Sequence, residues 1–359
     1  MGTTIHFSEK HMQRLMKGFE HRSLTDGLFN HDIDQEFSGV RTVHVKSIQT
    51  SPLQNYDRNK QVGTGSRYGE THEVGDDEQT FTMAKDVSLS LSIDKGNNVE
   101  QFNMKRAGEV MNAYRDEVII PAVDKHRMEK WAEGAGIHME LTGEMTKANI
   151  AETIIKLHNI QRNARVTGRS VLIVPYENLH ILSLADEWIK TESLAKETLT
   201  KGTVGRFDDM DVVPFINELM PANAKFMILN PKAAIAPMKI KDFKGHVDPP
   251  TLSGDLLEFR MMFDAFVLGK KADGVLVACA PSTVVKTPTI TMSGKAATIE
   301  TTTSGATVYY TTDGSDPRYS VDKKLYSAKL TLNPGDELRA YAEKDGLFWS
   351  DVASVDYTG

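Results

Sequence analysis

The chain has 359 residues, a formal net charge of −7 and a single cysteine. Hydrophobic residues make up 40% and charged residues 25%, which indicates a globular protein of two or three domains. The acidic balance argues against a protein whose main task is to grip nucleic acid, because neutralising phosphates needs clustered Lys and Arg.

The first 40 or so residues are polar and weakly periodic, with helical fragments possible around residues 11–19. Val43, Val45 and Ile48 indicate a strand. Residues 52–79 are rich in Gly, Asp, Glu and Arg, and such a long polar stretch usually marks a functional loop or a disordered segment. Strict alternation of Val87, Leu89, Leu91 and Ile93 with serines then predicts a half-buried strand. The polar stretch is therefore expected to be an excursion closed by these two strands.

A helix of about 35 residues is predicted next, over residues 98–134, with Asn97 or Asn98 as its N-cap and a bend at Pro121. Helical spacing predicts an apolar stripe along it, formed by Met104, Ala107, Met111, Tyr114 and Val118. A second helix follows, with Ile150, Ile154 and Leu157 on one face.

Shorter elements complete this part of the chain. A buried strand is expected at 171–174, a mostly helical segment at 179–199, and short strands at 212–216 and 226–229. Two apolar strands, 256–268 and 275–279, are expected around a turn at 270–274, and Cys279 should be buried in the second. Helices and strands alternate without regular βαβ units, so the predicted class is α+β.

The composition changes near residues 280–288. All 11 histidines lie before this point, and 11 threonines fall between residues 283 and 312. Pro281 and Pro288 bracket a short linker. The last 75 or so residues are expected to fold as a separate, all-β unit, and a chain truncated after Ser282 is expected to keep its function.

No catalytic motif is present in the sequence. The glycines at 63, 65 and 69 lack dinucleotide-binding spacing, and the chain has no Walker lysine loop and no HExxH. Two acidic groups, at 32, 34 and 36 and at 208, 209 and 211, lack calcium-loop spacing and are better explained as solvated turns. The sequence therefore predicts no enzyme activity, no metal site and no cofactor. No apolar run approaches the roughly 20 residues that span a bilayer, so no membrane partner is expected.

An ordered series of short segments runs through residues 41–280. The segments are Arg41–Val45, Asn55–Arg58, Phe81–Asp86, Arg115–Asp124, Thr203–Phe207, Phe226–Pro231 and Glu258–Gly274. In this order they resemble the major capsid proteins of tailed phages, the Hong Kong 97 (HK97) type.

The resemblance implies an N-terminal arm (1–40) and a capsid domain (41–280). Within that domain it implies an extended loop at about 50–93, a spine helix at about 98–134 and an axial domain at about 148–237. The loop would lie across a neighbouring subunit, with Tyr56, Asp57, Arg58, Arg67 and Tyr68 as contact residues. Lys60 and Lys85 cannot be matched to the cross-linking lysine of some relatives.

A second resemblance covers the C-terminal unit. The run from Ala306 to Pro317, with Tyr326 and Leu338–Ala342, is similar to the immunoglobulin-like (Ig-like) domain at the C-terminus of chitobiases. This implies a β-sandwich over residues 284–359. Tyr309, Tyr319 and Trp349 are candidate surface contacts for a glycan of a host or mucosal surface, since aromatic faces stack on sugars.

The resulting prediction is a structural protein of the phage virion that self-assembles as pentamers and hexamers in the host cytoplasm. Portal and scaffolding proteins and packaged DNA, held without sequence specificity, are the other expected partners. The sandwich should face outward. Two alternatives stay open: an encapsulin-like compartment shell, and a secreted carbohydrate-active protein.

Overall fold

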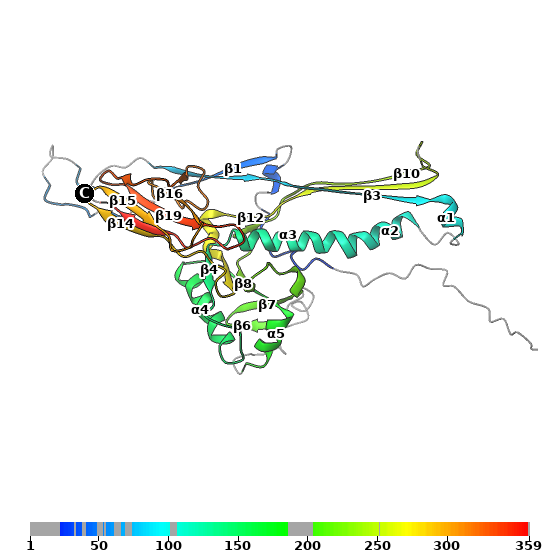
Figure 1. Ribbon diagram of the computed structural model, residues 1–359, viewed down its shortest axis with the longest axis horizontal. Coiled ribbons are helices and arrows are strands. Elements are labelled where there is room, and N and C mark those ends of the chain that lie inside the picture. The colour runs from blue at the N-terminus through cyan, green and yellow to red at the C-terminus, as the bar shows by residue number, and fades with distance from the viewer. Residues whose placement is uncertain are drawn as a thin grey trace, which may run out of the picture.

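The computed structural model describes residues 22–31, 34–37, 41–48, 53, 55–60, 66–68, 74–100, 106–185, 204–250 and 252–357. The helical fragments expected at 11–19 lie outside these residues, as do most of the expected N-terminal arm and the end of the helical segment expected at 179–199. Helices and sheets are mixed without regular βαβ units, so the fold is α+β, as predicted (Figure 1).

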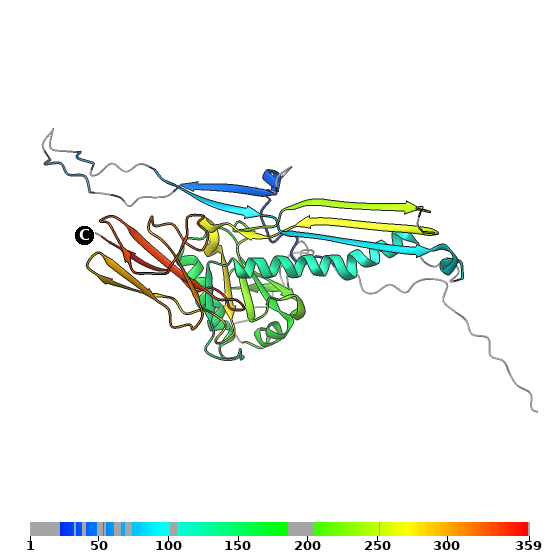
Figure 2. The ribbon, with the colours of Figure 1, turned by 45° about the horizontal axis from the view of Figure 1, so that its top comes forward.

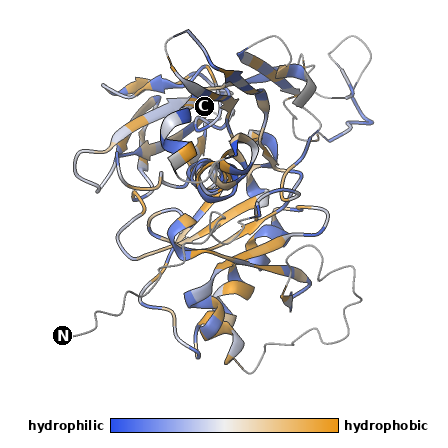
Figure 3. Ribbon diagram, turned by 90° about the vertical axis from the view of Figure 1, so that its right-hand side faces the viewer, coloured by the Kyte–Doolittle hydropathy of each residue, from blue (hydrophilic) through white to orange (hydrophobic). Residues whose placement is uncertain are grey.

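A six-stranded mixed sheet forms the centre of the main body, which we define as the described residues up to Cys279. In sheet order its strands are β4 (Ile137–Glu140), β13 (Val275–Cys279), β8 (Ala224–Leu229), β5 (Val171–Pro175), β7 (Met210–Phe215) and β6 (Gly205–Phe207). Every residue of β5 and β13 is buried, Cys279 included. Figure 3 shows these hydrophobic strands gathered in the middle of the molecule.

Helices cover both faces of this sheet. One face packs on α3 (Ile120–Glu133) through Met128 and Trp131. The short helix η3 (Asn217–Leu219) lies on this same face, since Leu219 packs against the same cluster. The other face packs on α4 (Ile150–Asn163), whose predicted apolar face is confirmed, and on α5 (Tyr176–Ser183). The sheet extends beyond the expected range of 148–237, because β4 and β13 are two of its strands.

The long helix is assembled from α2 (Ala107–Tyr114), a π-helical segment η2 (Arg115–Ile119) and α3. The prediction that it starts at Asn97 or Asn98 is wrong. Those residues lie inside a separate helix, α1 (Lys95–Glu100), where Asp94 accepts a hydrogen bond from the Asn97 N–H at 2.9 Å. Val118 is also misplaced by the prediction, since it is 51% exposed. The π-helical turn inserts an extra residue ahead of Pro121, which rotates Ile119 onto the apolar face in its place.

A three-stranded antiparallel sheet lies along the long helix (Figure 1). Its strands are β10 (Met238–Val247), β11 (Gly254–Phe263) and β3 (Lys85–Asp94), with β11 in the middle. The alternation of β3 is confirmed, because its serines are exposed while its apolar residues face inward. The turn expected at 270–274 is the 3-10 helix η4 (Gly269–Gly274), but the strands before and after it belong to different sheets.

The polar excursion connects β1 (Thr42–Ile48) to β2 (Asp76–Thr82), which pair as a hairpin that we call the loop hairpin. The register runs from Thr42 opposite Thr82 to Ile48 opposite Asp76. The expectation that β3 closes the excursion is therefore wrong, since β3 pairs with β11 instead. Sequence reasoning missed β2 because its residues are mostly acidic or polar. Two short elements lie near the hairpin's base: η1 (Asp34–Phe37), and the pair β9 (Ala234–Ile235) and β12 (Phe266–Val267).

The C-terminal sandwich, β14 to β20, consists of two sheets. The first contains β14 (Thr289–Ser293), β15 (Ala296–Glu300) and β18 (Leu330–Thr331). The second contains β17 (Lys324–Leu325), β16 (Thr307–Thr311), β19 (Glu337–Glu343) and β20 (Ala353–Asp356). Both sheets contribute to a core of their own, which includes Ile299, Val308 and Leu338. The sandwich lies beside the C-terminal end of α3 and beneath the loop hairpin (Figure 2).

Candidate functional site

The loop hairpin is a polar, two-stranded arm. Its ladder is reinforced by exposed cross-strand pairs, with Lys46 Nζ at 3.0 Å from Asp76 and His44 Nδ1 at 2.7 Å from Glu78. The Lys46 ammonium lowers the pKa of Asp76. Exposed pairs of this kind add little stability. The loop hairpin is therefore ordered mainly by the backbone pairing of β1 with β2.

The five predicted contact residues of the excursion lie together at its tip, which we call the loop tip: Tyr56, Asp57, Arg58, Arg67 and Tyr68. The Asp57 N–H donates to the Arg67 carbonyl at 2.9 Å, and the rings of Tyr56 and Tyr68 meet edge to face at 5.0 Å. Arg67 Nε donates to the Lys60 carbonyl. Tyr56 is 49% exposed and Tyr68 is 80% exposed. Tyrosine and arginine are the residue types that dominate binding energy at protein interfaces, so an exposed pair of each is suited to contact another protein.

An apolar groove of about 710 Å³ lies between the long helix and the three-stranded sheet. Met111, Ile119 and Phe259 line it, and Phe243 at its edge is 50% exposed. The chain segment 23–25 borders the groove and is fixed to the helix by Asp124, which accepts hydrogen bonds from Ser23 Oγ, the Leu24 N–H and Thr25 Oγ1 at 2.6–2.9 Å.

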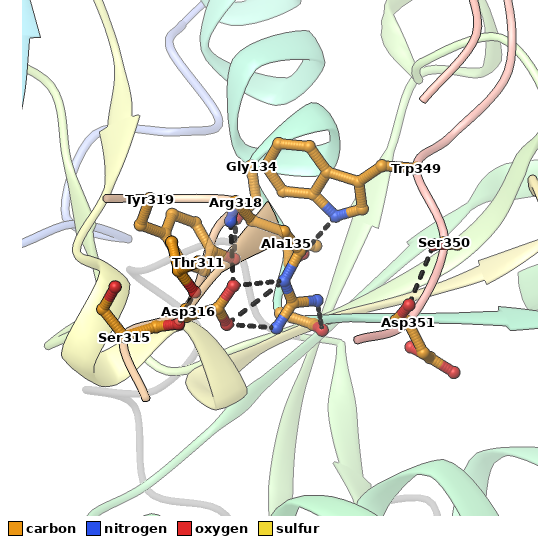
Figure 4. A network of polar contacts seen from close by, with 11 residues as sticks. Gly134, Ala135, Thr311, Ser315, Asp316, Arg318, Tyr319, Trp349, Ser350 and Asp351 are labelled. Carbon is orange, nitrogen blue, oxygen red and sulfur yellow. Dashed lines mark hydrogen bonds and ion pairs between the residues drawn. The ribbon is translucent and has the colours of Figure 1, made fainter. Parts of the chain in front are cut away.

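The sandwich meets the main body at a polar junction next to the end of α3 (Figure 4). Three successive backbone carbonyls accept hydrogen bonds there: Gly134 from Tyr319 Oη at 3.0 Å, Ala135 from Trp349 Nε1 at 3.1 Å, and Gly136 from Arg318 Nη1 at 2.6 Å. Asp316 holds the guanidinium from the other side, with Oδ2 at 2.7 Å from Nη2. The Arg318 side chain is only 8% exposed.

Aromatic rings continue the junction into both domains. Tyr309 stacks on Tyr341, and Tyr341 and Tyr319 each meet Trp349 edge to face. On the main-body side, Phe348 stacks on His138 at 4.8 Å. Burial lowers the pKa of His138 to about 4, so the imidazole is neutral at neutral pH and donates from Nε2 to the Ala132 carbonyl.

The three candidate glycan contacts are thus placed in one chain of rings, but this chain runs inward. Tyr319 and Trp349 use their polar atoms on the main body, and only Tyr309 lies at the outer end, with Lys323 Nζ at 4.8 Å from its ring centre. Of the three predicted surface contacts, Tyr319 and Trp349 therefore have their polar atoms engaged by the main body. Sequence reasoning missed Arg318 and His138, because nothing local in the sequence reveals a partner about two hundred residues away.

The acidic group around Asp208 is paired with cations and a histidine. Asp208 Oδ2 lies 2.7 Å from His158 Nδ1, and Asp211 lies 2.6 Å from Arg169. The other acidic group, at 32, 34 and 36, is only partly described. Within the described ranges no group of three or more His, Cys, Asp or Glu side chains is arranged to hold a metal ion. Over the same ranges no helix is long and apolar enough to cross a membrane.

Comparison with solved structures identifies the architecture. A structure titled "Mycobacterium phage Che8" aligns with a TM-score of 0.56 at 16% identity, over 76% of this chain and 96% of that one. The capsid of cyanophage P-SCSP1u aligns with a TM-score of 0.60 at 10% identity, over 76% and 93%. The mature capsid of bacteriophage PhiM1 aligns with a TM-score of 0.54 at 11% identity, over 77% and 93%. The chain has the phage capsid fold.

The C-terminal sandwich is an addition to this capsid fold. Residues 287–354 match the family model of the chitobiase/beta-hexosaminidase C-terminal domain, which confirms the Ig-like resemblance. No curated protein matches the sequence.

Proposed function

We propose that this chain is the major capsid protein of a tailed phage, a structural protein that assembles as pentamers and hexamers into an icosahedral head around double-stranded DNA. The single observation that carries the proposal is the capsid fold, shared over three quarters of the chain and nearly the whole of each aligned chain. The loop tip supports it, because an arm that presents exposed Tyr and Arg side chains away from its own core is suited to bind another copy.

The proposed division of the chain follows from this function. Residues 1–40 are the arm, 41–280 the capsid domain and 284–359 the Ig-like domain. The sandwich carries 8 Lys and Arg against 10 Asp and Glu, so it offers no basic anchor for DNA, which favours an outward position in the virion. Portal and scaffolding proteins are the further partners that a head of this kind requires, and assembly would take place in the host cytoplasm.

Sedimentation and negative-stain imaging of the purified full-length chain test the proposal. Closed particles are expected, and a preparation that stays monomeric or dimeric in every assembly condition, including with the phage's own scaffold, contradicts it. Deletion of residues 61–73 should leave a folded subunit that fails to form particles. Leu325→Ser is the control and should assemble normally, because it makes a polar change at an exposed site on the sandwich, away from the loop.

The encapsulin-like and carbohydrate-active alternatives receive less support. The titles of the aligned structures name phage capsids and heads. Two of the three rings that a glycan site would use are engaged at the junction. Particles that contain nuclease-protected DNA distinguish a phage head from an enzyme compartment.

A further inference from the structure

The junction has a feature that a flexibly tethered decoration would not need. An α-helix ends with carbonyl groups that lack partners within the helix and carries partial negative charge at that end. Here the carbonyls just past α3, at residues 134–136, receive an indole N–H, a phenol O–H and a guanidinium from the sandwich. Gly134 is the C-cap residue of α3, so the sandwich supplies a donor to the carbonyl at the end of the long helix and two more donors to the residues that follow it.

Tyr319 and a residue close to it, Val321, also connect the sandwich to the loop hairpin. Gln79 of β2 accepts from the Gly269 N–H at 2.7 Å and donates to the Val267 carbonyl at 3.0 Å. Tyr319 lies directly over Gly269, since a methyl group added there would come within 2.8 Å of the Tyr319 Cβ. Next to it, the Val321 N–H donates to the Glu78 carbonyl at 3.3 Å. One short segment of the sandwich, 318–321, thus touches both the helix end and the hairpin.

The linker adds a third fixed point. Glu140 of β4 accepts from the Ser282 N–H and from Lys286 Nζ, and Lys286 lowers the pKa of Glu140. The linker also bonds to the sandwich. The Val285 N–H donates to the Phe348 carbonyl, and the Phe348 N–H donates to the Thr283 carbonyl. The linker is consequently held along its length, and the sandwich has one orientation on the main body.

We propose that the Ig-like sandwich is a brace that fixes the angle between the long helix and the loop hairpin, and that its binding surface is the main body of its own chain. The direction in which the loop reaches a neighbour would then depend on the sandwich. This last step rests on the proposed shell function, whereas the bracing itself does not. The brace revises the expectation that a chain truncated after Ser282 keeps its function, because truncation removes the three donors to residues 134–136 and uncovers His138 and the end of α3.

The test is a pair of variants of the full-length chain, compared by hydrogen–deuterium exchange. The double variant Tyr319→Phe, Trp349→Phe removes two of the three donors and keeps aromatic rings in place. Tyr326→Phe is the matched control, because the Tyr326 hydroxyl accepts from the Ile299 N–H inside the sandwich. The double variant should speed exchange about tenfold in peptides covering 76–82, 134–140 and 267–275. The control should speed exchange within the sandwich alone.

Particle assembly supplies the second readout. If the brace sets the loop's direction, the double variant gives fewer or misshapen particles under conditions where the wild type and Tyr326→Phe give closed ones. Unchanged exchange in the hairpin and at 134–140 overturns the bracing, whatever the particles look like. Faster exchange there with normal particles overturns the step from bracing to loop direction. A wild-type chain that forms no particles counts against the proposed function instead, so the two failures are distinguishable.

Discussion

The loop tip and the junction are built from the same kinds of side chain but have opposite surroundings. Each contains two aromatic residues close to arginine side chains, two arginines at the loop tip and one at the junction. At the junction the Arg318 side chain is 8% exposed and bonds to a carboxylate and a carbonyl of the same chain. At the loop tip Tyr68 is 80% exposed, and its ring meets the ring of Tyr56 edge to face. Residue type thus marks a surface as suited to binding, while the fold decides whether the partner is the same chain or another one.

The largest expected effect is at Arg318. Replacing it by methionine removes the guanidinium that donates to Asp316 Oδ2 and to the Gly136 carbonyl, while the backbone N–H of residue 318 still donates to Asp316 Oδ1. We expect Arg318→Met to lower the free energy of unfolding by about 3 kcal/mol in urea denaturation. Arg339→Met is the control, because Arg339 is 39% exposed and lies 3.8 Å from Glu337. It should cost less than about 0.5 kcal/mol, and equal losses for the two variants would show that the junction is no more than ordinary surface.

The next effect depends on pH. The folded pKa of His138 is about 4, below its ordinary value of 6.5, so between these values the unfolded chain binds more protons. The stability from the neutral imidazole is complete above pH 6.5 and is lost as the pH falls toward 4, an effect of about 2 kcal/mol. Asp77 and Asp351 act in the opposite direction, because burial raises the pKa of each.

The contribution of His138 is therefore read from the difference between the wild type and His138→Gln. The glutamine amide can still donate to the Ala132 carbonyl, but it does not titrate. The wild type should lose stability relative to the variant as the pH falls from 6.5 to 4. A difference that stays flat across this range would mean that His138 is not kept neutral by its burial at the junction.

A smaller effect is expected at Gly269, where the hairpin, η4 and the sandwich meet. Gly269→Ala places a methyl group 2.8 Å from Tyr319 Cβ and 3.1 Å from Gln79 Oε1, so these groups must move. We expect a cost of about 1 kcal/mol in thermal or urea unfolding. Gly143→Ala is the control, because nothing lies within 4 Å of the added methyl. If both variants are neutral, the contact of Tyr319 with Gly269 is looser than the structure indicates.

The smallest effect on subunit stability is expected at the loop tip. Tyr56→Ser combined with Tyr68→Ser should change the free energy of unfolding by less than about 0.5 kcal/mol, because the two rings cover each other and little else. Particle yield should nevertheless fall sharply, measured by sedimentation beside the Leu325→Ser control. A large loss of subunit stability would instead show that the tip packs on its own chain.

Local patterns predicted the elements whose partners lie nearby or whose periodicity is strong. The alternation of Val87 to Ile93, the apolar face of α4 and the burial of Cys279 are all confirmed. Strand pairing was predicted less well. β1 pairs with the acidic β2, and β3 pairs with β11, more than 150 residues along the chain. Pairing of this kind is decided by what each strand can bury against, which hydrophobic spacing within one strand does not specify.

The sequence by itself determined the α+β class, the composition break before residue 288 and the two resemblances, because these depend on residue type and order. It also indicated five contact residues that the fold places together at the loop tip: Tyr56, Asp57, Arg58, Arg67 and Tyr68. Only the tertiary structure decided that Tyr319 and Trp349 face inward. The sequence does not show which acceptors their donors find. The fold brings the carbonyls of Gly134 and Ala135, just past α3, next to the connecting segments that carry Tyr319 and Trp349. A buried hydrogen bond between segments far apart in the chain depends on how the chain packs. An unpaired donor or acceptor costs free energy only where packing has removed it from water, and neither segment alone shows where that happens.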